Sequence, residues 1–63
     1  MKFNIAVYVG NRLHDKLLAI GIDERDAMIT AAWTEKEVTR VEWREEDTRQ
    51  WAQTILPFGL KRT

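Results

Sequence analysis

The sequence predicts an α+β fold: a small, mainly antiparallel sheet of about three strands, one packed helix in ββαβ order, and a C-terminal helix. Three patterns indicate this fold. Residues 2–9 and 37–45 alternate between apolar and polar side chains, as half-buried strands do, and residues 24–36 carry an apolar stripe with helical spacing. The chain has 63 residues with neither repeat nor linker, so we expect a single domain over residues 1–63.

The first strand spans residues 2–9 and places its apolar side chains on one face (Phe3, Ile5, Val7 and Val9). Gly10 and Asn11 then supply turn residues. Residues 12–22 fit two structures. As a strand over residues 16–22 they complete a hairpin, with Leu18, Ile20 and Ile22 on one face; as a helix they would begin at an Asn11 cap and end at Gly21. We favour the hairpin because the first strand otherwise lacks a neighbour.

The helix over residues 24–36 has Asp23 as its expected N-cap and Asp26 at the third helical position, a variant of the capping box. Its apolar stripe is formed by Met28, Ile29, Ala32 and Trp33. We therefore expect Trp33 to lie in the core.

The strand over residues 37–45 places Thr39, Val41 and Trp43 on the inward face, so that Trp43 faces the helix. Its outward face holds Val38, Arg40, Glu42 and Arg44. This charged row is typical of a solvated sheet surface or of a docking strip.

A second helix is expected over residues 48–56, because three acidic residues precede it and Pro57 stops it. Its apolar stripe holds Trp51, Ala52, Ile55 and Leu56, and Phe58 and Leu60 are expected to anchor the tail that follows. A core this small offers this helix no certain place, so Trp51 is either a core residue or, as we favour, an interface residue.

Composition argues against an enzyme. Serine and cysteine are absent, the single histidine (His14) is expected at the surface beside a turn, and no ligand spacing indicates a metal or cofactor site. No apolar run approaches the ~20 residues that span a bilayer, and the N-terminus lacks a signal-peptide pattern. We expect a cytoplasmic protein that does not enter a membrane.

Charge is unevenly distributed although the net charge is zero. Residues 23–47 carry nine acidic and four basic side chains, a net charge of −5 that suits a basic protein partner or an ordinary solvated surface. A neutral chain is atypical of duplex-DNA binders. Tyr8 beside Arg40 and Arg44 on the outer sheet face would suit single-stranded nucleic acid, but protein recognition fits better, with Arg40, Arg44, Tyr8 and Trp51 as the candidate contact residues.

One stretch resembles a known family. In the helix, Asp26-Ala27, Ala31 and Trp33, followed by residues 37–41 (Glu-Val-Thr-Arg-Val), are similar to the small RNA-polymerase inhibitor of lytic coliphages, over roughly a quarter of the chain. The resemblance implies a hairpin, one helix and a third strand that bind the jaw region of the host polymerase and block initiation at host promoters. It also implies a binding role for Arg40. The second arginine of that family falls at Glu42, and a C-terminal helix departs from the family pattern.

The function expected from the sequence is therefore that of a non-enzymatic protein-binding module, a phage-type inhibitor of a host nucleic-acid machine such as bacterial RNA polymerase. Two alternatives stay open. One is a small nucleic-acid-binding module, and the other is a homodimeric, antitoxin-like subunit.

Overall fold

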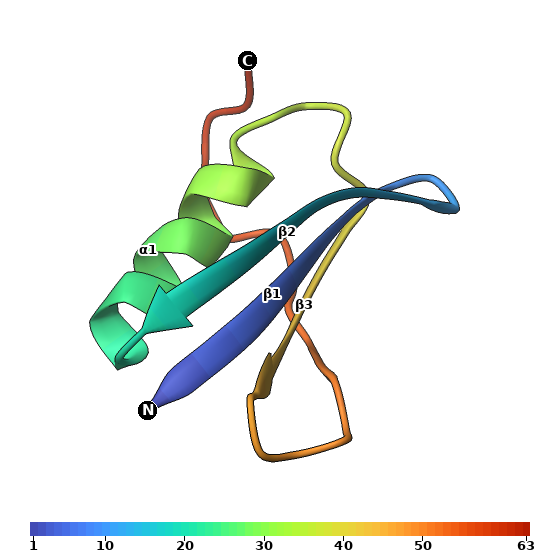
Figure 1. Ribbon diagram of the computed structural model, residues 1–63. Coiled ribbons are helices and arrows are strands. Elements are labelled where there is room, and N and C mark those ends of the chain that lie inside the picture. Colours follow the sequence, from blue (N-terminus) through green and yellow to red (C-terminus); the bar gives the residue numbers. More distant parts are fainter.

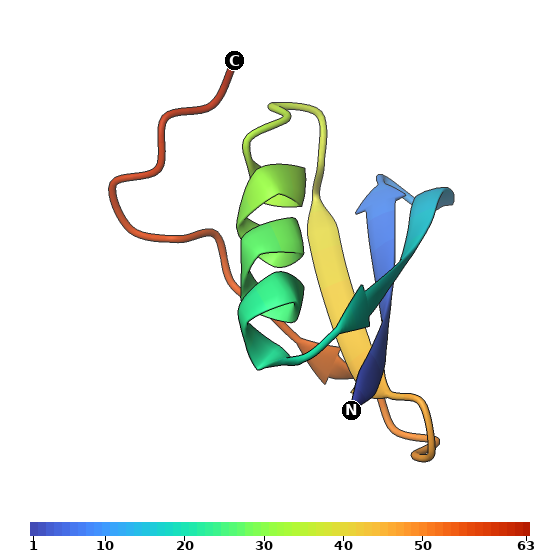
Figure 2. The ribbon, with the colours of Figure 1, turned by 60° about the vertical axis from the view of Figure 1, so that its left-hand side comes forward.

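A four-stranded antiparallel sheet and one helix make up the fold. The computed structural model describes residues 1–63, with strands β1 (Lys2–Val9), β2 (Arg12–Ile20), β3 (Arg40–Glu45) and β4 (Ala52–Gln53) and helix α1 (Ile22–Trp33). The strand order is β2-β1-β3-β4. Helix α1 and the C-terminal segment lie on one side of the sheet, and no segment covers the other side (Figures 1 and 2). The α+β class is confirmed, with a fourth strand added.

The core lies between α1 and the sheet. Alternate side chains of β1 and two residues of α1 supply most of it, as their spacing predicted, and strands β2 and β3 add one residue each. Its buried members are Phe3, Ile5, Val7, Ala19, Ile29, Trp33, Val38 and Val41. Trp33 is 6% exposed, so its predicted core position is confirmed.

The hairpin between β1 and β2 is confirmed, and the alternative helix over residues 12–22 is wrong. Strand β2 starts at Arg12 rather than at residue 16, because Gly10, with φ +61°, closes a tight turn that lets pairing begin at once. The register skips His14 at a bulge opposite Val7 and Tyr8. Leu18 and Ile20 share a face as expected, but this face points away from the helix and both side chains are exposed.

Helix α1 begins at Ile22 and ends at Trp33, so the predicted Asp23 cap is wrong. Gly21 is the N-cap residue, and its backbone (φ 88°, ψ 160°) turns the chain directly from β2 into the helix. No side chain caps the first turn. Asp26 instead forms an ion pair with Arg25 at 2.9 Å.

Arg25 also explains how Trp43 is held on the inward face of β3. The Arg25 guanidinium carbon lies 4.3 Å from the centre of the Trp43 ring. The Trp43 ring packs edge-on against Phe3, with ring centres 5.6 Å apart. Trp43 thus faces the helix as predicted, although it stays partly exposed.

Strand β3 starts at Arg40, three residues later than predicted, and the predicted faces of Val38 and Thr39 are both wrong. Because both residues precede the strand, its alternation does not apply to them, and Val38 turns into the core with 2% exposure. The exposed Thr39 hydroxyl accepts a hydrogen bond from the Gly10 N–H and donates one to the Tyr8 carbonyl.

The predicted C-terminal helix over residues 48–56 is absent, and β4 lies there instead. Ala52 pairs with Trp43 across the outer edge of β3, and the Thr54 N–H donates to the Val41 carbonyl at 3.0 Å. The Thr54 hydroxyl also accepts the Trp33 indole N–H at 2.8 Å. An extended chain therefore satisfies the edge of β3 and a part-buried indole, which a helix would leave unpaired.

The last residues return to the helix C-terminus and fasten the segment after β4 (Figure 2). The Thr63 N–H donates to the Thr34 carbonyl at 3.0 Å. One Arg62 guanidinium nitrogen donates to the carbonyls of Glu35 and Val38, both at 2.6 Å. Leu60 packs against the core, so its anchoring role is confirmed, whereas the expected anchor Phe58 is fully exposed.

Candidate interaction surface

The uncovered side of the sheet, which we call the open face, gathers all four candidate contact residues. Cross-strand pairs share a face, so the register fixes its members. They are Lys2, Asn4, Ala6 and Tyr8 of β1, Leu13, Lys16, Leu18 and Ile20 of β2, Arg40, Glu42 and Arg44 of β3, and Gln53 of β4. Ala52 shares the helix-side face with its partner Trp43, so alternation places its neighbour Trp51 on the open face. The Arg44 guanidinium lies over the Trp51 ring on this face.

Tyr8 and Arg40 form the first aromatic–arginine pair. They are direct partners in the register of β1 and β3, and the Arg40 guanidinium carbon lies 4.0 Å from the centre of the Tyr8 ring. The Arg40 Nε atom also lies 3.4 Å from the Glu42 carboxylate. The stacked ring and the carboxylate hold the guanidinium close to the sheet surface.

Arg44 and Trp51 form the second pair. The Arg44 guanidinium carbon lies 5.2 Å from the centre of the Trp51 ring, and its Nη1 atom donates to the Thr48 carbonyl at 2.8 Å. Trp51 nevertheless stays 40% exposed. Trp51 is therefore a surface residue and not a core residue, and its role at an interface stays a prediction. Because the sequence predicted a helix at this position, the contact with Arg44 was not predicted.

Apolar side chains border these pairs on strand β2. Leu13, Leu18 and Ile20 are each about half exposed or more, at 50%, 49% and 63%. Ala6 lies between β2 and β3 on this face and is buried by its neighbours. The open face therefore combines apolar and aromatic contact area with polar groups.

The charge of the open face is positive. Four basic residues (Lys2, Lys16, Arg40 and Arg44) accompany the single carboxylate of Glu42, a net charge of +3. The Glu42 carboxylate accepts a hydrogen bond from Gln53 at 3.2 Å and forms an ion pair with Arg40. Both contacts lie within the open face. The acidic excess of the chain lies elsewhere, on α1 and in the loops.

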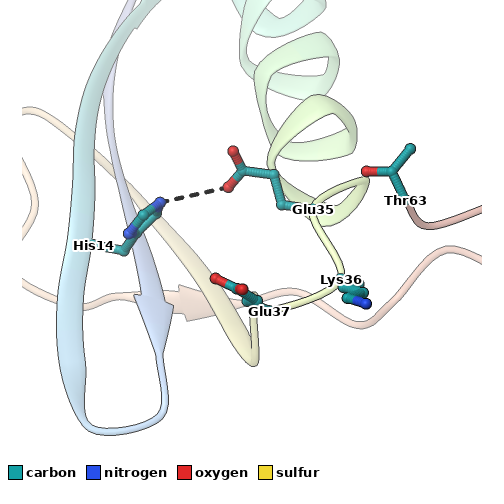
Figure 3. A pocket seen from close by; sticks show the side chains of 5 residues that line it. All are labelled: His14, Glu35, Lys36, Glu37 and Thr63. Carbon is teal, nitrogen blue, oxygen red and sulfur yellow. Dashed lines mark ion pairs between the residues drawn. The ribbon is translucent and has the colours of Figure 1, made fainter.

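A polar pocket of about 270 Å³ lies at the opposite side of the sheet, between the hairpin and the end of α1 (Figure 3). Its lining residues are His14, Glu35, Lys36, Glu37 and Thr63. His14 Nε2 lies 3.5 Å from Glu35 Oε2, but both side chains are about half exposed, so water screens this pair. No three His, Asp or Glu side chains of the chain are grouped closely enough to hold a metal ion.

A second exposed apolar segment was not predicted from the sequence. Ile55 and Phe58 are 86% and fully exposed, on a loop fixed at one end by Thr54 and at the other by Leu60 and Arg62. Pro57 and Gly59, which flank Phe58, are the turn signals that could have identified this loop.

Comparison with known proteins adds no constraint on this surface. No protein-family model, curated protein or solved structure matches the chain. Helix α1, with its 12 residues, is too short to cross a bilayer, and no other helix is present.

Proposed function

We propose that this chain is a non-enzymatic protein-binding module whose open face docks on a partner protein. The observation that carries the proposal is the pairing of two aromatic residues with arginines on one uncovered sheet face, Tyr8 with Arg40 and Trp51 with Arg44. Tyrosine, tryptophan and arginine are the residues most enriched at binding hot spots.

The arrangement of these side chains favours binding energetically. Arg40 and Arg44 are long side chains that would each lose about 0.5–1.5 kcal/mol of rotamer freedom when an interface immobilises them. Contacts to Glu42 and to the Thr48 carbonyl already restrict both guanidinium groups. Part of the entropic cost of association is thus met before a partner arrives.

Bacterial RNA polymerase is the proposed partner, on the strength of the family resemblance. The resemblance assigns binding to the third strand, and Arg40 lies on β3 within the open face. Glu42 departs from the family pattern, but Arg44 provides a second arginine on the same strand and the same face. Docking of this face on the polymerase would inhibit transcription initiation.

Biolayer interferometry with immobilised bacterial RNA polymerase tests the proposal. Arg40→Glu should weaken binding by on the order of a hundredfold or more, because it removes the Tyr8 pair and places a carboxylate beside Glu42. The control Lys61→Glu makes the same change in net charge on the exposed C-terminal segment and should bind like the wild type. Equal binding of all three proteins, or no binding of the wild type, contradicts the proposed partner surface.

A single-stranded nucleic-acid platform is the second candidate, since the same face carries two aromatic rings and a net charge of +3. Fluorescence anisotropy with labelled single-stranded DNA and RNA at low salt separates the two functions. Binding that weakens steeply as salt rises and is lost in Arg40→Glu favours this candidate. Absence of binding at micromolar protein excludes it.

A further inference from the structure

The outer edge of β2 is a free sheet edge. Strand β2 is nine residues long, pairs with β1 on one side only, and contains no proline. Its open-face side chains Leu18 and Ile20 are 49% and 63% exposed. A long edge of this kind presents backbone N–H and C=O groups to which a further strand can bind.

The register shows which backbone groups point outward. In an antiparallel pair, residues alternate between bonding the neighbouring strand and pointing away from it. The Gly21 N–H donates to the Met1 carbonyl at 2.8 Å, which sets the phase of this alternation at the end of β2. Counting back by two from Gly21, the residues bonded to β1 are Ala19, Leu17 and Asp15. The residues between them, Lys16, Leu18 and Ile20, therefore point their backbone groups outward.

Side-chain carboxylates accept hydrogen bonds from two of these three outward N–H groups. The Lys16 N–H donates to Asp15 Oδ1 at 2.9 Å. The Ile20 N–H donates to Glu24 Oε1, from the first turn of α1, at 3.1 Å. The N–H of Leu18, which lies between them, donates to no carboxylate.

We infer that the edge of β2 is a self-pairing surface that Asp15 and Glu24 hold closed. Without these two carboxylates, β2 would pair antiparallel with β2 of a second copy about a two-fold axis at Leu18. In that register the two Leu18 residues face each other and Lys16 lies opposite Ile20 of the second copy. All outward N–H groups then donate to carbonyls of the second copy. No like charges lie opposite each other, and the two exposed Leu18 side chains pack against one another.

A second copy suits this edge because the pattern of outward groups is symmetric about Leu18. The two carboxylates interfere with pairing in two ways. They occupy the donors that a second strand requires, and they place negative charge where its carbonyl oxygens would approach. Charged side chains that blunt an edge in this way are a known means of preventing edge-to-edge association. This inference does not depend on the proposed function, which uses the face of the sheet.

Sedimentation equilibrium of Asp15→Ala/Glu24→Ala against the wild type tests the inference. The wild type is expected to be monomeric at micromolar concentration. Freeing two donors in each copy should tighten dimerisation by on the order of a hundred- to a thousandfold. The control Asp23→Ala/Glu46→Ala removes two exposed carboxylates, one of them also from the first turn of α1, and should stay monomeric.

Adding Leu18→Pro to the Asp15→Ala/Glu24→Ala variant locates the contact. Proline removes the outward N–H of Leu18 and is tolerated on an edge strand, so the triple variant should return to a monomer. If circular dichroism shows that the double variant has lost its fold, the single variants carry the same test with about a tenfold effect each. A folded double or single variant that stays monomeric, or a triple variant that still dimerises, would overturn the inference.

Discussion

Thr54→Val is the substitution that most sharply tests how the C-terminal segment is fastened to the domain. Valine has nearly the shape of threonine but lacks the hydroxyl, which accepts the Trp33 indole N–H and donates to the Val41 carbonyl, each at 2.8 Å. The Val41 carbonyl keeps the backbone N–H of residue 54 at 3.0 Å. The main loss is therefore the acceptor of the indole, which belongs to a residue only 6% exposed.

Leaving a buried donor unpaired costs about 1–3 kcal/mol, so we expect Thr54→Val to lower the free energy of unfolding by about 2 kcal/mol. In a domain of this size, 1 kcal/mol corresponds to roughly 4–8 °C in Tm, and the expected shift is about 8–16 °C. Thermal unfolding followed by circular dichroism and urea titration followed by tryptophan fluorescence measure it.

Thr48→Val is the matched control, because the Thr48 hydroxyl donates to a carbonyl at 2.9 Å but is exposed. It should change Tm by no more than about 2–4 °C, the equivalent of about 0.5 kcal/mol. Trp33→Phe removes the donor instead of the acceptor, so combining it with Thr54→Val should cost less than the sum of the single changes. A Thr54→Val protein as stable as the wild type, or fully additive variants, would refute this account of the C-terminal segment.

Four further substitutions have expected outcomes that thermal and urea unfolding can check. Gly21→Ala meets no atom within 4 Å but forces alanine to φ +88°, so backbone strain alone should destabilise the fold by about 1–3 kcal/mol; a neutral effect would exclude this N-cap geometry. Arg62→Ala removes the donor to the carbonyls of Glu35 and Val38 and should cost about 1–2 kcal/mol, with an unchanged Tm as the contrary result. Val38→Ala should cost about 2 kcal/mol and Ile55→Ala almost nothing, because these side chains are 2% and 86% exposed; equal costs would contradict the assigned burial.

Local patterning was sufficient to predict the first strand and the buried face of the helix. The alternation from Phe3 to Val9 and the helical spacing of Ile29 and Trp33 both repeat at the period of their element, and both faces pack as expected. Patterning failed where an element is short or irregular. Val38 lies before β3, and its burial depends on how the loop returns from the helix, which no period describes.

The C-terminal segment shows why the remaining structure could not be predicted. Residues 51–56 carry helical spacing, but their conformation is decided by the unpaired edge of β3 and by the indole N–H of Trp33. Both requirements come from residues distant in the sequence. Tertiary hydrogen bonding thus outweighs local propensity in this segment.

The candidate site was predicted as a set of residues but not as a geometry. Arg40 and Arg44 alternate on a predicted strand, so their common face followed from the sequence. The pairing of Tyr8 with Arg40 requires the register between β1 and β3, and the pairing of Trp51 with Arg44 requires β4. Neither register can be derived from local spacing.

Hydroxyl-radical footprinting of the chain in complex with bacterial RNA polymerase tests directly whether the open face docks on the polymerase. Aromatic side chains report solvent access in such an experiment, and Tyr8 and Trp51 lie on the open face. The fully exposed Phe58 belongs to the C-terminal segment, which lies on the helix side of the sheet (Figure 2). We expect the complex to protect Tyr8 and Trp51 and to leave Phe58 reactive. Protection of Phe58 with Tyr8 and Trp51 unchanged would contradict docking through the open face.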